Sequence, residues 1–158
     1  MEINVLFDDG LEGVLETDWL VSVAEKALTA QGVRPEIELG LVIVGQEKVR
    51  QLNSSYRGID EPTDVLSFAM LPESAGIVSA SFIVAPDGMQ HLGEVIISYP
   101  QAVIQAEEHR HSVKKEVAIL IIHGVLHLLS YDHEQPEEER EMRAREAEVL
   151  DYIAGELS

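Results

Sequence analysis

The feature that most constrains the fold is an almost unbroken apolar run from Val117 to Leu129. Ser112 lies just upstream, where it can cap a helix that continues to Leu129. Because apolar side chains occupy nearly every position of the run, this helix must be buried on most sides. The run is too short to cross a bilayer and contains two histidines, so we expect a central core helix rather than a membrane span.

The segments around this helix predict an α+β fold. Alternating apolar residues are typical of strands, whereas apolar residues three and four positions apart predict helices. We expect strands at 2–8, 37–43, 65–70 and 94–98, and helices at 18–31, 46–54, 100–109, 112–129 and from Pro136 onwards. Residues 71–92 are predicted mostly as loop, with a short strand at 81–84 as an alternative. The interleaving favours a small mixed four-stranded sheet packed with about five helices.

Length and composition favour one domain, 1–158, with no repeat or linker dividing it. A chain of this size can bury a core without disulfides. The sequence contains no cysteine, which leaves imidazole, carboxylate and hydroxyl groups as the available chemistry. The N-terminus lacks the basic and apolar regions of a signal peptide, so we expect a cytoplasmic location and no membrane partner.

The formal net charge is −18, which argues against a polyanionic partner on composition alone. The acidic excess lies at the two ends of the chain. Residues 48–115 carry 6 basic and 8 acidic side chains and are nearly balanced. Any anion-binding site should therefore be a local pocket built from this middle segment.

Three histidines form the strongest candidate site. His123 and His127 are four positions apart on the buried helix, so their rings lie on one face, one turn apart. A turn after the helix can bring His133 back as a third ligand, and three imidazoles with one open position are typical of catalytic zinc. The alternative is that these are core histidines, each bonded to a backbone carbonyl. One metal ion would satisfy both helical imidazoles at once, which favours a metal site.

The same histidine spacing occurs in metzincin proteases, whose first histidine is followed by a glutamate that acts as general base. Here Gly124 occupies that position. The spacing therefore supports a metal more strongly than it supports peptide hydrolysis.

A second informative stretch runs from Asn53 to Phe68 and includes Arg57. A planar guanidinium can hold a phosphate group through two parallel hydrogen bonds. The alternative is an ordinary salt bridge from Arg57 to Asp60 or Asp64.

Together these stretches resemble the YbeY family, bacterial endoribonucleases linked to ribosomal RNA maturation. Residues 123–133 match the pattern H-G-x-L-H-L-x-G-Y-D-H except at Ser130, and 56–68 match Y-R-G-x-D-x-P-T-D-V-L-S-F in full. Residues 92–98 resemble the strand L-G-D-[IV]-x-[IV]-S, with Glu94 in place of aspartate. His111-Ser112 followed by Lys115-Glu116 resembles the lead-in to the metal helix. Serine instead of glycine just after a helix costs on the order of 1 kcal/mol if the residue adopts a positive φ.

The resemblance implies an α+β fold, one Zn²⁺ ion bound by His123, His127 and His133, and a functional role for Arg57. It also implies a single-strand-specific endoribonuclease acting on small-subunit (16S) ribosomal RNA, in 3′-end maturation and ribosome quality control. The expected partners are single-stranded RNA and, beyond it, ribosomal proteins or the small subunit, with no DNA.

The expected chemistry is metal-assisted cleavage of a phosphodiester, with Arg57 neutralising charge in the transition state. Asp132 is a candidate for the general base or for orienting a ligand histidine. Weaker candidates for the base are Glu94 and His111, for each of which a structural role is an alternative.

Lys114 and Lys115, in the first turn of the metal helix, either approach the RNA backbone or form a solvated surface pair. The acidic C-terminal helix either binds a basic protein or presents a solvated face. Two other functions stay open: a metal-dependent hydrolase of another substrate, and a non-catalytic, zinc-containing ribosome assembly factor.

Overall fold

The computed structural model describes residues 1–153 apart from 9, 34, 62, 70–89 and 130–135. For a few further residues, including Arg57, it describes the backbone but not the side chain. In chain order the elements are β1 (Glu2–Phe7), α1 (Thr17–Ala30), β2 (Ile37–Val44), α2 (Gln46–Arg57), β3 (Val65–Ala69), β4 (Gln90–Ser98), α3 (Tyr99–His109), α4 (Val113–Leu128) and α5 (Pro136–Ile153). The predicted α+β class is confirmed. The alternative strand at 81–84 lies outside the described residues.

The four strands form one mixed sheet in the order β1-β2-β4-β3. β2 lies in the middle and pairs in parallel with both β1 and β4. β3 pairs antiparallel with β4 at the other edge. The structure therefore confirms a small mixed sheet of four strands, with five helices in the part of the chain described above.

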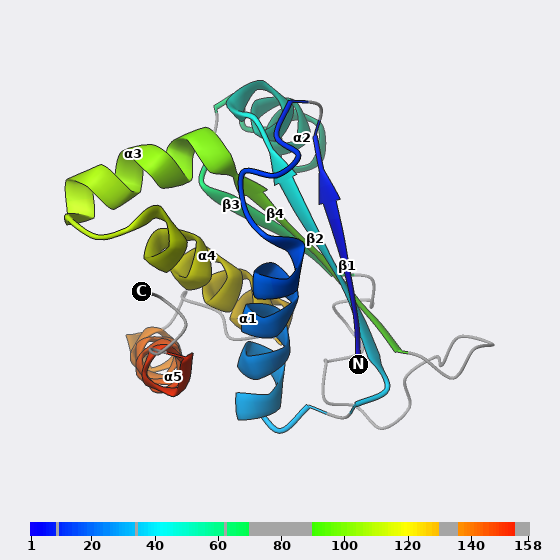
Figure 1. Cartoon of the computed structure of the whole chain (residues 1–158), viewed down its shortest axis with the longest axis vertical. Coiled ribbons are helices and arrows are strands. Elements are labelled where there is room, and N and C mark those ends of the chain that lie inside the picture. Colours follow the sequence, from blue (N-terminus) through cyan, green and yellow to red (C-terminus); the bar gives the residue numbers. More distant parts are fainter. Residues whose placement is uncertain (9, 34, 62, 70–89, 130–135, 154–158) are drawn as a thin grey trace.

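Helices cover both faces of the sheet (Figure 1). The alternating pattern of β2 explains the two layers: Leu39 and Leu41 join the large core that includes α1 and α4. Val42 and Val44 point the other way and pack with Val49 of α2 in a smaller core. α5 contacts α1 and α4 rather than the sheet, so it forms an outer layer beyond the main helices (Figure 1).

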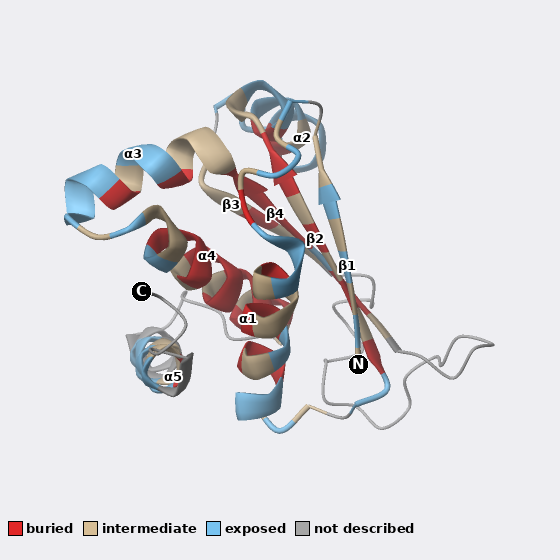
Figure 2. Ribbon diagram, in the orientation of Figure 1, coloured by how far each residue is buried: buried red, intermediate tan, exposed pale blue. Residues whose placement is uncertain are grey.

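α4 is the central helix, as the apolar run predicts, and it is buried along most of its length (Figure 2). Ser112 caps it, because its side-chain oxygen accepts a hydrogen bond from the backbone N–H of Lys115 at 3.1 Å. The helix lies very close to the sheet at Gly124. A Cβ atom at this position would lie 2.5 Å from Cγ1 of Val95 in β4.

Gly124 therefore permits the close helix–sheet contact, and a larger residue fits there only if the helix and the sheet move apart. This observation gives a structural reason for the absence of the metzincin glutamate. No helix in the described ranges is long and apolar enough to cross a membrane.

Candidate metal centre

His123 and His127 lie in the second half of α4 and meet at their ring nitrogens. The two Nε2 atoms are 3.0 Å apart, and the rings are inclined at 62° with centroids 4.5 Å apart. In a tetrahedral zinc site with bonds of about 2.0–2.1 Å, neighbouring ligand atoms are about 3.3 Å apart. The pair is therefore already close to the separation that two ligands of one ion require.

Glu146 of α5 completes this pair from a distant part of the sequence. Its Oε1 atom lies 2.9 Å from Nδ1 of His123, and both side chains are partly buried, with exposed fractions of 23% and 30%. A carboxylate on Nδ1 fixes the proton there and directs the Nε2 lone pair towards the metal position. Glu146 thus orients His123 towards His127.

Sequence reasoning missed Glu146, although a signal was present. Apolar residues recur at helical spacing in the last helix, at Met142, Val149, Leu150 and Ile153. Glu146 lies four positions after the first of these and three before the second, so it is a charged residue on the apolar side of an amphipathic helix. A carboxylate in that position needs a partner in the fold.

Several predicted site residues lie outside the described part of the structure. His133 and Asp132, like Ser130, belong to the segment 130–135, and their roles stay predictions. Arg57 is the last residue of α2, which ends where Gly58 adopts φ +70°, but its side chain is outside the described residues.

Both carboxylates considered as salt-bridge partners of Arg57 have other partners. Asp60 accepts two hydrogen bonds from Arg50, at 2.8 and 3.2 Å. These bonds hold the pKa of Asp60 below its usual value. Asp64 accepts hydrogen bonds from the backbone N–H of Val65 at 2.8 Å and from Nε2 of Gln105 at 3.3 Å.

The motif that contains Arg57 contacts α4 through β3. The hydroxyl of Ser67 donates a hydrogen bond to the carbonyl oxygen of Gly124 at 3.2 Å. The strand that ends the second motif therefore lies directly against the helix that carries the first.

The weaker candidates are spread over three places. Glu94 is exposed, and its side chain lies next to Gly40 of β2. It is on the opposite face of β4 from Val95 and α4, so the structure does not bring it to the histidine pair. Lys114 has its Nζ atom 5.5 Å from the centre of the Trp19 ring, while Lys115 is exposed.

His111 belongs to a separate cluster with His109 and Glu116. Its Nε2 atom is 2.6 Å from Oε1 of Glu116, and Nδ1 of His109 is 2.9 Å from the same oxygen. Burial alone would raise the pKa of Glu116, but hydrogen bonds from His109, His111 and Gln105 outweigh it and lower the pKa. The hydrogen bond with Glu116 raises the pKa of His109. The donor atoms of these three residues are close enough together that the group could hold a metal ion.

The fold and the histidine pair define an α+β protein with two converging imidazoles on a central helix. The model of the family described as Endoribonuclease YbeY matches residues 14–154. The chain belongs to this family, which confirms the resemblance and extends it beyond the two motifs.

Three relatives in the same family illustrate the similarity. A protein of Dehalococcoides mccartyi named Endoribonuclease YbeY is 49% identical over 97% of this chain and 90% of its own length. Proteins of the same name from Chloroflexus aurantiacus and Bacillus cytotoxicus are 44% and 40% identical over 96% and 95% of this chain and 94% and 96% of their own lengths. A solution structure from Thermotoga maritima has a TM-score of 0.58 over 97% of this chain and 92% of its own, at 24% identity, which supports the fold alone.

Proposed function

We propose that this protein is a metal-dependent endoribonuclease that cleaves phosphodiester bonds in single-stranded RNA. The observation that carries the proposal is the convergence of His123 and His127, with Glu146 behind them, in a family whose relatives are named endoribonucleases. Within this proposal the substrate is small-subunit (16S) ribosomal RNA near its 3′ end, in maturation and ribosome quality control. Cleavage takes place in the cytoplasm, and the partners are the small ribosomal subunit and its proteins.

His123, His127 and His133 would hold a single zinc ion, and the donor chemistry fits it. Two imidazoles with a carboxylate behind one of them are a recurring arrangement around zinc. A zinc ion bound there would supply Lewis-acid chemistry, which polarises a phosphoryl oxygen or acidifies a water molecule.

The residues of the chain have separate tasks in this mechanism. Glu146 retains the proton on Nδ1 of His123, so that the Nε2 lone pair stays available throughout the reaction. Arg57 binds the scissile phosphate and stabilises the additional negative charge that develops in the transition state. Asp132 either orients a ligand histidine or accepts a proton from the attacking group.

The peptide-hydrolase alternative is disfavoured by the contact at Gly124. A glutamate there would overlap Val95 of the sheet. Two alternatives remain: a metal-dependent hydrolase of a substrate other than RNA or peptides, and a zinc-containing assembly factor without nuclease activity, which is an outcome of the test.

The test compares cleavage of an end-labelled unstructured RNA, the same RNA in a duplex and a DNA of the same sequence. We expect cleavage of the unstructured RNA only, and losses of at least about 100-fold in His127→Ala and Arg57→Ala. Arg50→Ala is the matched control for Arg57, because Arg50 lies on the same helix in an exposed ion pair with Asp60. His91→Asn is the control for His127, because His91 lies on β4 and pairs with Glu38.

Equal activity in all purified variants would assign the cleavage to a contaminant and refute the proposal. Binding to small ribosomal subunits without any cleavage would favour the assembly factor.

A further inference from the structure

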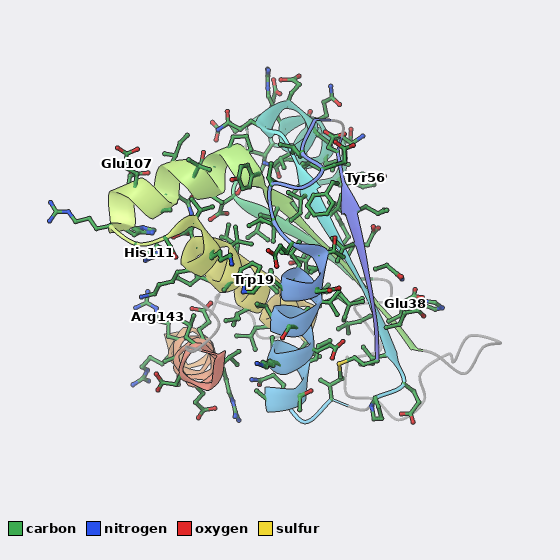
Figure 3. The ribbon with its side chains drawn as sticks, in the orientation of Figure 1. Trp19, Glu38, Tyr56, Glu107, His111 and Arg143 are labelled. Atoms are coloured by element: carbon green, nitrogen blue, oxygen red, sulfur yellow. The ribbon has the colours of Figure 1, made fainter. Side chains whose placement is uncertain are left out.

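Two imidazoles and a buried carboxylate meet where α3 passes into α4. His109 is the last residue of α3, His111 follows after one residue, and Glu116 lies in the first turn of α4. Figure 3 shows His111 at this corner. Arg110 has φ +58°, a conformation that is uncommon for residues other than glycine. This left-handed residue reverses the chain, so that the side chains on either side of it reach the same carboxylate.

The geometry is that of three donors around one point. Both imidazole nitrogens approach the same oxygen, Oε1 of Glu116, at 2.9 and 2.6 Å. One ligand atom from each residue lies within 4.8 Å of the others. Ligand atoms of a tetrahedral zinc ion are about 3.3 Å apart, so shifts of less than about 1 Å would admit an ion between them.

The carboxylate is held in place from behind. Glu116 is 2% exposed, and its second oxygen, Oε2, accepts a hydrogen bond from Nε2 of Gln105 at 2.9 Å. This bond leaves Oε1 directed at the two histidines. The side chains of His111 and His109 are 16% and 55% exposed, so the cluster opens to solvent on the His109 side and an ion can enter there.

The two helix ends support the charges that a metal site needs. Glu116 lies at the N-terminal end of α4, where the helix dipole favours an anionic carboxylate. His109 lies at the C-terminal end of α3, where the dipole favours a cation. Metal entry also adds positive charge to a chain with a formal net charge of −18.

We propose that His109, His111 and Glu116 bind a second divalent transition-metal ion, separate from the one assigned to His123 and His127. Two imidazoles and one carboxylate are a donor set that suits Zn²⁺. Glu116 and His123 are seven residues apart on one straight helix, which separates the two sites by about 10 Å along its axis.

The role of this ion is to fasten the α3–α4 corner. It joins the end of one helix to the start of the next. Through Gln105, which also donates to Oδ2 of Asp64 at 3.3 Å, it connects with the segment that leads into β3. Metal bound at this corner therefore stabilises the position of α3 against α4 and β3.

The test measures how many Zn²⁺ ions the metal-free full chain binds, by equilibrium dialysis and elemental analysis, and repeats the titration with Co²⁺ to record its absorption spectrum. His109→Asn is the main variant, because the exposed side chain can be replaced without disturbing the core. Glu116→Gln is the second, because it keeps the shape of the side chain and can keep the contact with Gln105. His91→Asn is the matched control, because it removes a histidine from another His–Glu pair.

We expect wild type and His91→Asn to bind one more equivalent of Zn²⁺ than either cluster variant. The affinity loss in His109→Asn should exceed the roughly 10–100-fold that loss of an outer partner causes. His127→Ala should lose a different equivalent and retain the Co²⁺ spectrum of the cluster. Equal stoichiometry in wild type and both cluster variants would overturn the second site and identify a metal-free hydrogen-bonded triad. If His127→Ala binds as many Zn²⁺ ions as wild type while both cluster variants bind one fewer, the centre at His123 and His127 is refuted and the second site stands.

Discussion

Replacing Gly124 with alanine perturbs the contact that sets the distance between α4 and the sheet. The added Cβ atom would lie 2.5 and 3.0 Å from the two methyl carbons of Val95, and 3.2 Å from Oγ of Ser67. Favourable carbon–carbon contacts are about 3.5–4.0 Å, so helix and strand must separate by about 1 Å. Val95 is fully buried and its β-branched side chain is stiff, so it cannot rotate away at low cost.

The expected loss of stability follows from two opposing effects. Overpacking a core costs about 1–3 kcal/mol, and this severe overlap falls at the upper end. Alanine is better than glycine within a helix by about 1 kcal/mol. We therefore expect Gly124→Ala to lower the free energy of unfolding by about 2 kcal/mol, measured by urea denaturation followed by circular dichroism.

A double-mutant cycle with Val95→Ala separates these effects. Val95→Ala removes both clashing methyl groups, so in that background Gly124→Ala should raise the free energy of unfolding by up to about 1 kcal/mol. The two backgrounds then differ by about 3 kcal/mol, and the cost of Val95→Ala itself cancels in the comparison. Equal losses in both backgrounds would refute the close contact as the reason for glycine.

The remaining predictions concern two carboxylates. Glu146→Gln should weaken zinc binding by about 10–100-fold, measured in competition with a chromophoric chelator. Glu148→Gln is the control and should have no effect, because Glu148 lies on the same helix but is exposed and paired with Arg145. Equal zinc affinities in the two variants would contradict the orienting role of Glu146. Arg50→Ala should raise the pKa of Asp60, measured by NMR titration, because it removes the hydrogen bonds that lower it. Because the pKa of Asp60 is lower in the folded protein than its ordinary value of 3.8, the Arg50–Asp60 pair stabilises the fold at pH values above 3.8. This stabilisation is lost as the pH falls through the pKa of Asp60 in the folded protein. An unchanged pKa of Asp60 would contradict this.

The fold was predictable where local pattern and tertiary contacts agree. The alternation in β2 predicts a strand with one face in the core, which its burial pattern matches, and the apolar run of α4 predicts a buried helix. β4 was predicted to begin at Glu94 but begins at Gln90. Gln90 and His91 are polar and Gly93 follows soon after, so this segment has no strand pattern of its own. Pairing with β2 makes it a strand: His91 lies opposite Glu38 in the register of the two strands. Single-strand patterns contain no information about such a partner.

The candidate site was predictable only as far as it lies within one element. The spacing of His123 and His127 is fixed by the geometry of a helix. Glu146 reaches His123 because α5 packs on α4, and no local pattern specifies that packing. His109 joins His111 and Glu116 because Arg110 takes a left-handed conformation, which residues other than glycine rarely adopt.

Three polar contacts join α4 to its neighbours. Glu116 is buried, and a buried polar group without a partner destabilises a fold by about 1–3 kcal/mol, so this carboxylate restricts the elements around it. Glu116 is hydrogen-bonded to Gln105 of α3, His123 to Glu146 of α5, and the Gly124 carbonyl to Ser67 of β3. A rotation or one-turn slip of α4 would break all three contacts together. Glu116 and His123, two of the residues proposed to bind metal, therefore also help to fix the register of the central helix against α3 and α5.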